Sequence, residues 1–343
     1  MDGSEAKKYV WEGAIPLQIH LHESEVTTLP APPPALVLGP RNGYLPLLIP
    51  LIKPHFSSTL PPGLDTVWFD YKGLPLKWYI PTGVLFDLLC AEPERPWNLT
   101  VHFRAYPSET LSPYEGEDSV KWSFINSLKE AAYIMNGNCK CVMNMSQPDQ
   151  LMLWQSVVKG DLECYTRIFS RLKFGTIGEG RIPVRLYLRI VSEKLNDLED
   201  LPPISSWDEI RYINRPVELQ KYGVCSLRDA LESLLPELFM PKSSMRDLRM
   251  REKESGGGPS GIKSALGPDD FEVIKNTGDE AEQTHNIAST EVDSVESSCL
   301  KLIRIQGIEP NLDLPFSWAA NHLKNPEHFL HICLYILNNE SQI

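Results

Sequence analysis

VWFDYKGLPLKW, residues 67–78, contains the pattern that decides the fold, because its last five residues are echoed near the other end of the chain. LPLKW at 74–78 corresponds to LPFSW at 314–318. Each pentapeptide follows a run rich in β-branched and aromatic residues, VWFDYKG at 67–73 and LKLIRIQG at 300–307. Such runs are typical of β-strands. The echo therefore indicates that one supersecondary unit occurs twice.

The segments that follow the two pentapeptides also correspond. A short, helix-like apolar segment comes after each one, GVLFDLLC at 83–90 and WAANHL at 318–323. The chain then meets a proline and ends each unit in a predicted strand, WNLTVHF at 97–103 and FLHICLYIL at 329–337. The correspondence thus extends beyond the pentapeptides and keeps the same order.

The segments that precede the pentapeptides correspond as well. IPLQIHL at 15–21 and IPVRLYL at 182–188 alternate apolar and polar residues with a period of two, which is typical of a half-buried strand. A second strand is predicted after each of them, at 35–38 and at 215–219. Each unit therefore begins with two strands.

A helix completes the order of each unit. It ends at Phe56 in the first copy (residues 15–103) and spans 226–239 in the second copy (182–337), where Ser226 is the expected N-cap. Each copy reads strand, strand, helix, strand, strand, short helix, strand, which is the order of a β-grasp or ubiquitin-like domain. The alternative is that two unrelated α+β domains share similar turn sequences by chance. The shared order of elements disfavours this alternative.

The predicted fold class is α+β, with two ubiquitin-like domains that flank a helix-rich domain. Residues 241–298 form a predicted insertion in the second ubiquitin-like domain. This segment lacks apolar periodicity and is rich in Ser, Gly and acidic residues, so we expect it to be disordered. The predicted boundaries are 1–107 for the first ubiquitin-like domain with a short N-terminal helix, 108–178 for the helix-rich domain, 179–240 with 299–338 for the second ubiquitin-like domain, and 241–298 for the insertion.

The helix-rich segment contains a long amphipathic helix. Residues 119–137 repeat their apolar positions with a period of 3.6, and Gly137 is a suitable residue to end the helix. Lys129 falls at the edge of the apolar stripe, and the neighbouring Glu130 would favour the charged form of its amine. The predicted stripe consists of Phe124, Leu128, Ala131, Ala132 and Met135.

Composition limits the function classes. Hydrophobic content of 42% and charged content of 23% are ordinary for a globular protein, and the formal net charge of −12 argues against nucleic acid as a partner. No signal peptide and no run of 18 apolar residues is found, so a cytoplasmic protein with reduced cysteines is expected. A basic cluster could touch a membrane, although interleaved acidic residues favour a solvated run: Lys242, Arg246, Arg249, Arg251 and Lys253.

Catalytic motifs are scarce in the sequence, and no catalytic residue, cofactor or metal is predicted. Cys139 and Cys141 form a CxC pair without a neighbouring histidine, which favours ordinary packing over a thiol or metal site. A metal site could also be formed by His328, His331 and Cys333. The favoured interpretation is that these histidines lie at the surface of a sheet. The chain ends in NNESQI without the terminal glycine of a ubiquitin-type donor, so it is expected to be an acceptor or a scaffold.

Aromatic residues gather in both copies and allow two interpretations. They could form a surface that binds a peptide or an amphipathic helix, or they could fill the small cores of the two domains, which is favoured. The residues are Trp68, Tyr71, Trp78, Tyr79, Trp97, Phe316 and Trp318.

The motifs taken together resemble the autophagy protein 5 family, in particular its land-plant members. The resemblance covers nearly the whole chain apart from the insertion. It is carried by VWFDYKGLPLKWYIPTGVLFDLL, PWNLTVHF, SLKEA, IRIQGIEP and the closing W-x3-HL-x-NPE-x-FLHI.

The resemblance implies a role in autophagosome formation. Family members are conjugated through the lysine of the SLKEA-type motif, here Lys129, to the ubiquitin-like autophagy-related protein 12 by separate E1-like and E2-like enzymes. The conjugate binds a helix of autophagy-related protein 16. The complex acts like an E3 that promotes transfer of autophagy-related protein 8 onto phosphatidylethanolamine, so peripheral recruitment to the pre-autophagosomal membrane is expected. The chain alone is not expected to be an enzyme.

Two other classes of function remain open at this point. A non-covalent adaptor would hold partner helices with its two ubiquitin-like domains and would not need Lys129. A thiol enzyme would use Cys139 or Cys141, and it is the least favoured because no local signature activates either thiol.

Overall fold

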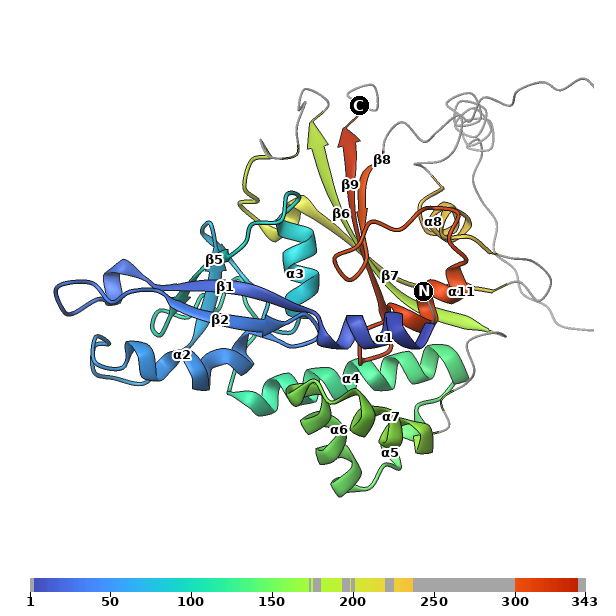
Figure 1. The fold of residues 1–343 in the computed structure, drawn as a ribbon, viewed down its shortest axis with the longest axis horizontal. Helices are drawn as coiled ribbons and strands as arrows, with labels where there is room; N and C mark the ends of the chain where they lie inside the picture. Colours follow the sequence, from blue (N-terminus) through green and yellow to red (C-terminus); the bar gives the residue numbers. More distant parts are fainter. Residues whose placement is uncertain are drawn as a thin grey trace, which may run out of the picture. The chain divides into compact units, whose positions relative to one another are not determined.

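Two mixed β-sheets, one from each copy, form the β part of the computed structural model (Figure 1). The structure describes residues 3–172, 174, 180–192, 198, 201–219, 225–236 and 300–338, all within one unit. The predicted insertion at 241–298 and its basic cluster lie outside these residues.

The first sheet has the strand order β2-β1-β5-β3-β4. Its central strands β1 and β5 run parallel, and every other neighbouring pair is antiparallel, as in a β-grasp sheet. The strands are β1 (Ala14–Leu21), β2 (Ala35–Pro40), β3 (Trp68–Tyr71), β4 (Leu74–Pro75) and β5 (Trp97–His102).

Alternation along β1 builds the core of this copy. Ile15, Leu17 and Ile19 are buried, and they belong to one apolar cluster with Ile52 and Phe56 of α2 (Ile49–Phe56). A short 3₁₀ turn, Leu45–Leu48, leads into α2, and α3 (Thr82–Leu89) follows β4. The remaining helix of this part is the predicted N-terminal one, α1 (Gly3–Glu12).

The second sheet has the order β7-β6-β9-β8, again with a parallel central pair, β6 and β9. Its strands are β6 (Arg181–Ser192), β7 (Ile210–Glu218), β8 (Leu300–Arg304) and β9 (Leu330–Asn338). The copy also contains α8 (Leu227–Leu234) and α11 (Phe316–His322). Ser226 caps α8 as predicted, and Asp229 completes a capping box.

The prediction of a fifth strand in the second copy is wrong for the residues that the structure describes. The LPFSW segment pairs with the start of α8 instead of a strand, since Leu227 N–H donates to Leu314 O at 2.8 Å and Phe316 N–H donates to Cys225 O at 2.8 Å. Phe316 then begins α11 with its side chain fully buried. These backbone hydrogen bonds join the LPFSW segment to the start of α8, so the segment does not add a strand to the sheet.

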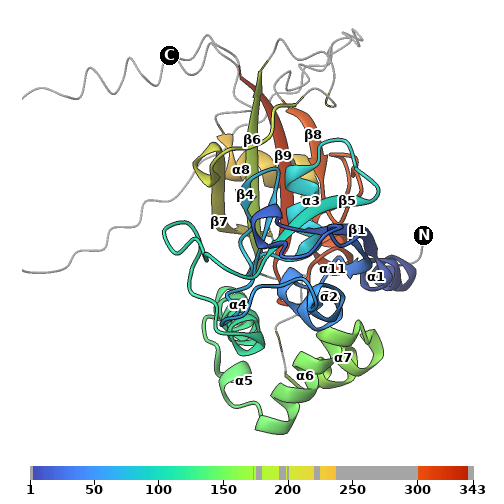
Figure 2. The same ribbon diagram turned by 90° about the vertical axis from the view of Figure 1, so that its left-hand side faces the viewer.

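Four helices form the middle of the chain, and α5, α6 and α7 gather below α4 (Figure 2). They are α4 (Glu117–Asn136), α5 (Lys140–Met143), α6 (Gln147–Lys159) and α7 (Leu162–Phe169). Gly137 and Gly160 end α4 and α6 in the left-handed conformation, at φ of 71° and 68°, which costs glycine little. No helix in the described part of the chain is long and apolar enough to cross a membrane.

Candidate functional site

Helix α4 carries Lys129 between the two copies. The predicted apolar stripe is confirmed at Phe124, Leu128 and Ala131, which are buried, whereas Met135 is half-buried. α4 packs against β6 of the second copy, against α5 and against the 3₁₀ turn before α2. A lysine on this helix therefore has a rigid base.

The Lys129 residue is half-buried, and its side chain has one weak hydrogen bond. Its amine donates to Asn126 Oδ1 at 3.4 Å, a long distance for such a bond, and no other partner occurs among the described residues. The amine is thus available to a reactant that approaches from solvent.

Glu130 does not serve Lys129 as the sequence suggested. Its carboxylate accepts hydrogen bonds from Arg185 Nη2 at 2.9 Å and from Asn214 Nδ2 at 2.7 Å. Arg185 also donates to Ser127 Oγ at 3.2 Å and lies over the Phe329 ring. Glu130 therefore joins α4 to β6 and β7.

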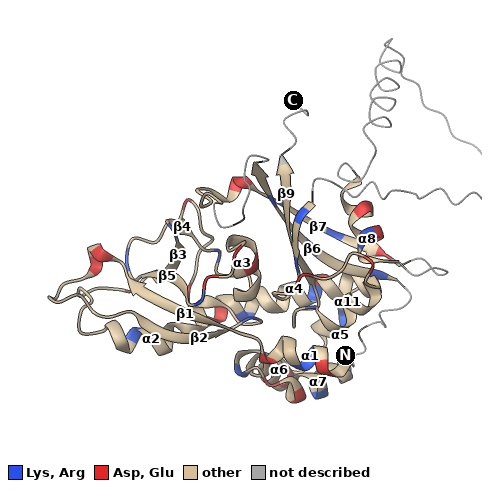
Figure 3. Ribbon diagram, turned by 45° about the horizontal axis from the view of Figure 1, so that its top comes forward, with Lys and Arg blue, Asp and Glu red and all other residues tan. Residues whose placement is uncertain are grey.

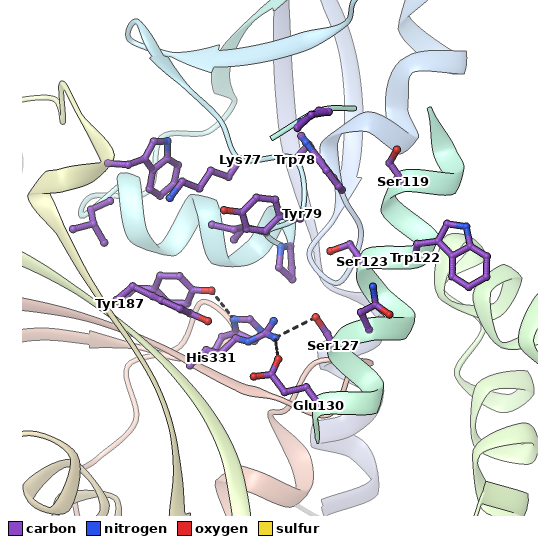
Figure 4. Close-up of a pocket in the computed structure, with 18 of the residues that line it drawn as sticks. Lys77, Trp78, Tyr79, Ser119, Trp122, Ser123, Ser127, Glu130, Tyr187 and His331 are labelled. Carbon is purple, nitrogen blue, oxygen red and sulfur yellow. Dashed lines mark hydrogen bonds and ion pairs between the residues drawn. The ribbon is translucent and has the colours of Figure 1, made fainter. Parts of the chain in front are cut away.

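A cavity of about 720 Å³ opens beside this ion pair, and all three parts of the chain contribute to its walls (Figure 4). Residues 77–81 come from the first copy, and α4 and the sheet of the second copy provide the other walls. Asn126, the partner of Lys129, is one of the lining residues. The aromatic lining residues are Trp78, Tyr79, Trp122, Tyr187, Trp207 and Tyr212.

The cavity floor contains a buried polar chain. His331 Nε2 lies 2.8 Å from Glu327 Oε1, and Tyr187 Oη lies 3.3 Å from His331 Nδ1. Burial lowers the pKa of His331 despite the Glu327 carboxylate, so the imidazole is neutral near pH 7. The prediction of histidines on an open sheet surface is wrong, since His331 is 4% and His328 6% exposed.

Burial raises the thiol pKa of Cys333 and of Cys141, both among the described cysteines. Cys333 faces Val84 O across 3.8 Å, and burial raises the pKa of its thiol well above the usual value. Burial also raises the pKa of Cys141, which opposes thiolate formation. Among the described residues no three His, Cys, Asp or Glu side chains are grouped to hold a metal ion.

The predicted aromatic set divides between core and surface. Trp97, Tyr71 and Phe316 are buried. Trp68 is half-buried and stacks on His102 with 3.6 Å between ring centroids, whereas Trp78 and Tyr79 line the cavity. The interpretation as core residues is therefore confirmed for part of the set, and a binding surface stays a prediction for Trp78 and Tyr79.

Comparison with known proteins agrees with this architecture in all three parts. Residues 10–103 match the family described as "Autophagy protein ATG5, UblA domain", 117–175 match its "alpha-helical bundle region" and 181–334 match its "UblB domain". The chain belongs to the autophagy protein 5 family. The two ubiquitin-like copies and the helical middle are thereby confirmed as the family's UblA, helical bundle and UblB regions.

Relatives in land plants are similar over nearly their full length. Autophagy protein 5 of Arabidopsis thaliana is 53% identical over 97% of this chain and 98% of its own. The protein of Oryza sativa subsp. indica is 52% identical over 97% of this chain and 94% of its own. The crystal structure of Kluyveromyces marxianus Atg5 shares the fold, with a TM-score of 0.64 at 19% identity over 97% of this chain and 99% of that one.

Sequence reasoning missed the cavity and its polar floor. Arg185 and Glu130 are 55 residues apart, and no local pattern relates them. The available signal was Arg185 itself, a charged residue within an apolar strand pattern at 182–188. A charge in a half-buried strand calls for a partner on another element.

Proposed function

We propose that this autophagy protein 5 family member is a conjugation acceptor and scaffold in autophagosome formation. Lys129 accepts the C-terminal carbonyl of autophagy-related protein 12 from the thioester of an E2-like enzyme, after activation by an E1-like enzyme. The observation that carries the proposal is an available lysine amine, in the family's SLKEA-type motif, on a helix held between two ubiquitin-like domains.

The chemistry requires a neutral amine. The Lys129 nitrogen attacks the thioester carbonyl, a C–N bond forms, the C–S bond breaks, and the cysteine thiolate of the conjugating enzyme leaves. One proton of the amine passes to a base. No carboxylate or imidazole among the described residues hydrogen-bonds this amine, so the conjugating enzyme has to supply the base.

The 720 Å³ cavity suits a partner helix, which we assign to autophagy-related protein 16. Aromatic rings that are partly exposed, such as Tyr79 and Trp122 at 36% and 51%, bind the apolar side chains of an amphipathic helix well. Arg185 and Glu130 lie at the cavity wall and can pair with polar side chains of the same helix. The conjugate with this helix then acts like an E3 for lipidation of autophagy-related protein 8 on a membrane to which it is recruited from the cytoplasm.

Substitution of the acceptor tests the proposal. In a reconstituted conjugation reaction, Lys129→Arg is expected to eliminate the slow-migrating covalent species on a denaturing gel. Lys121→Arg, on the same helix but bonded to Asp118 at 3.5 Å, is the matched control and should conjugate normally. A branched peptide at Lys129 in mass spectrometry supports the assignment, and an undiminished covalent species in Lys129→Arg contradicts it.

A non-covalent adaptor is the second candidate, and one observation favours it. Lys129 itself does not line the cavity, so a helix could dock there without conjugation. This candidate predicts that Lys129→Arg still supports transfer of autophagy-related protein 8 onto phosphatidylethanolamine in a reconstituted system. Loss of that transfer in Lys129→Arg, with retention in Lys121→Arg, favours the acceptor.

A further inference from the structure

A second cavity, of about 240 Å³, is lined by residues of α1, α7 and α11, and it shares no lining residue with the cavity that holds Trp78 and Tyr79. These three helices lie near the N-terminal end of the chain (Figure 3). Its volume is that of roughly eight water molecules. Four lining side chains are basic or imidazole groups and none is acidic. The polar lining residues are Lys7, Tyr165, Thr166, Ser170, Asn321, His322, Lys324, Asn325 and His328, with Trp11, Phe169 and Pro326 as the apolar ones.

Lys324 is the central cation of this cavity. Its amine lies 3.2 Å from His328 Nδ1, and its side chain is half-buried. Within the described part of the chain, neither Lys324 nor Lys7 has a carboxylate within 4.0 Å, although nine other lysine and arginine side chains there do, among them Lys8 and Arg185. Two lysines that share an enclosed space without a counter-ion are unusual, because desolvated charges need partners.

His328 is fixed in this arrangement by its surroundings. Its backbone has a φ of 69°, in the left-handed region that a non-glycine residue adopts at a cost, and its N–H donates to Asn325 O at 2.9 Å. Its ring stacks on Phe169 with 3.9 Å between centroids. When Lys324 donates to Nδ1, the proton of the neutral ring resides on Nε2, which makes the ring a further donor.

The electrostatics of the cavity favour the binding of an anion. Burial, together with the nearby Lys7, lowers the pKa of Lys324 to about 7. Burial lowers the pKa of Lys7, and burial with both lysines lowers the pKa of His328 well below its usual value. A positive charge on one of these side chains therefore lowers the pKa of its neighbours, and a bound anion would raise these pKa values.

We propose that this cavity is a binding site for a phosphate-type oxyanion, held by Lys7 and Lys324 with the hydroxyl of Thr166 and the side-chain amides of Asn321 and Asn325 as further donors. The donors come from three helices and the turn before β9, so the site exists only in the folded chain. The ligand is a tetrahedral dianion, either free phosphate or the phosphate of a lipid headgroup. The site is separate from both Lys129 and the proposed partner-helix cavity.

Sulfate is the first probe, because its charge does not change near neutral pH. Titration calorimetry with the full chain, at constant ionic strength set with chloride, is expected to show saturable binding. Lys324→Met and Lys7→Met should each weaken it by at least about tenfold. Lys8→Met is the matched control, since Lys8 is on α1 and pairs with Glu12, and it should bind like the unsubstituted chain. Equal affinities of Lys324→Met and Lys8→Met would overturn the site.

Two further measurements do not depend on a substitution that could disturb folding. The affinity for sulfate is expected to fall between about pH 6 and about pH 8, as Lys324 loses its proton; Lys7, Tyr165, His322 and His328 are the other titratable groups that face the cavity. The pKa of Lys324, followed by NMR in the unsubstituted chain, should rise when sulfate is added. An unchanged Lys324 pKa at high sulfate contradicts the proposal.

The source of the anion is distinguished by a second set of probes. Inorganic phosphate is compared with vesicles of phosphatidylcholine that do or do not contain phosphatidic acid. Binding of inorganic phosphate that depends on Lys324 identifies a free-anion site, and Lys324-dependent binding of only the phosphatidic acid vesicles identifies a headgroup site. Lack of Lys324-dependent binding to any of these probes rejects both.

Discussion

The carboxylate of Asp87, on α3 of the first copy, accepts a 2.7 Å hydrogen bond from the backbone N–H of Gly307 in the second copy. Arg41 pairs with the same carboxylate, and both side chains are largely buried. Gly307 has a φ of 80°, and a Cβ there would meet the Arg41 guanidinium at 2.8 Å. Only glycine therefore fits this position, and Asp87 joins the two ubiquitin-like copies directly.

Asp87→Ala is expected to destabilise the protein by about 3–5 kcal/mol, because it leaves Arg41 buried without its partner. The measurement is the midpoint of urea unfolding followed by circular dichroism.

The matched control for Asp87→Ala is Asp118→Ala, which removes an exposed partner of Lys121 and should cost at most about 1 kcal/mol. Equal shifts in the two variants would show that the Asp87 pair does not hold the copies together.

Tyr79→Ala is expected to weaken binding of a partner helix by about tenfold or more, since an aromatic wall of the proposed docking cavity is lost. Titration with a synthetic amphipathic helix of the partner gives the affinity. Tyr9→Ala removes an exposed tyrosine side chain on α1, outside this cavity, and should leave the affinity unchanged. A Tyr79→Ala protein that binds as tightly as Tyr9→Ala would place the helix elsewhere.

Stability should fall when the pH is lowered through about 6.5. Burial lowers the pKa of both His328 and His331 in the folded chain, so the unfolded chain binds these protons more tightly. Acidification below about pH 6.5 therefore favours unfolding, by up to about 1.4 kcal/mol per pH unit for each histidine. His331→Gln should flatten the dependence of the urea midpoint on pH, whereas His20→Gln, at an exposed position, should not.

Lys324→Met is expected to stabilise the protein in dilute chloride buffer below about pH 7, where the folded chain carries the charged amine at a cost. The difference from the unsubstituted chain should shrink as the pH rises from about 7 to about 10.5, because the folded state then releases the Lys324 proton first. Thermal unfolding of both proteins at several pH values measures this difference in stability. A stabilisation that does not change with pH would point to better packing instead of charge.

The first strand was predictable because its burial is regular: every second residue of β1 is buried, and a period of two records this directly. The prediction of a half-buried strand at 182–188 is wrong, since β6 is buried at every position from Ile182 to Arg189 except the half-buried Arg185. Helix α4 was predictable for a related reason, since Gly137 ends it and its buried stripe repeats every 3.6 residues. Periodicity reports burial within one element.

Contacts between elements were not predictable in the same way. The LPFSW segment was expected to form a strand, yet its partner is the backbone at the start of α8, which no local pattern indicates. His331 was expected at a sheet surface, but α4 and the first copy cover that face of β9. Lys7 and Lys324 come together from opposite ends of the chain, so their shared cavity has no signature in either segment.

The parallel central pair of the second sheet has a consequence for biosynthesis. β6 has no central partner until residues 330–338 have been synthesised, and that occurs only after the whole stretch from 237 to 299. The first sheet needs nothing beyond His102. Translation therefore completes the first sheet early. The β6 edge that later pairs with β9 stays unpaired while more than a hundred further residues are synthesised. During that interval the nascent chain presents an exposed strand edge, which is the period in which a chaperone would have to protect it.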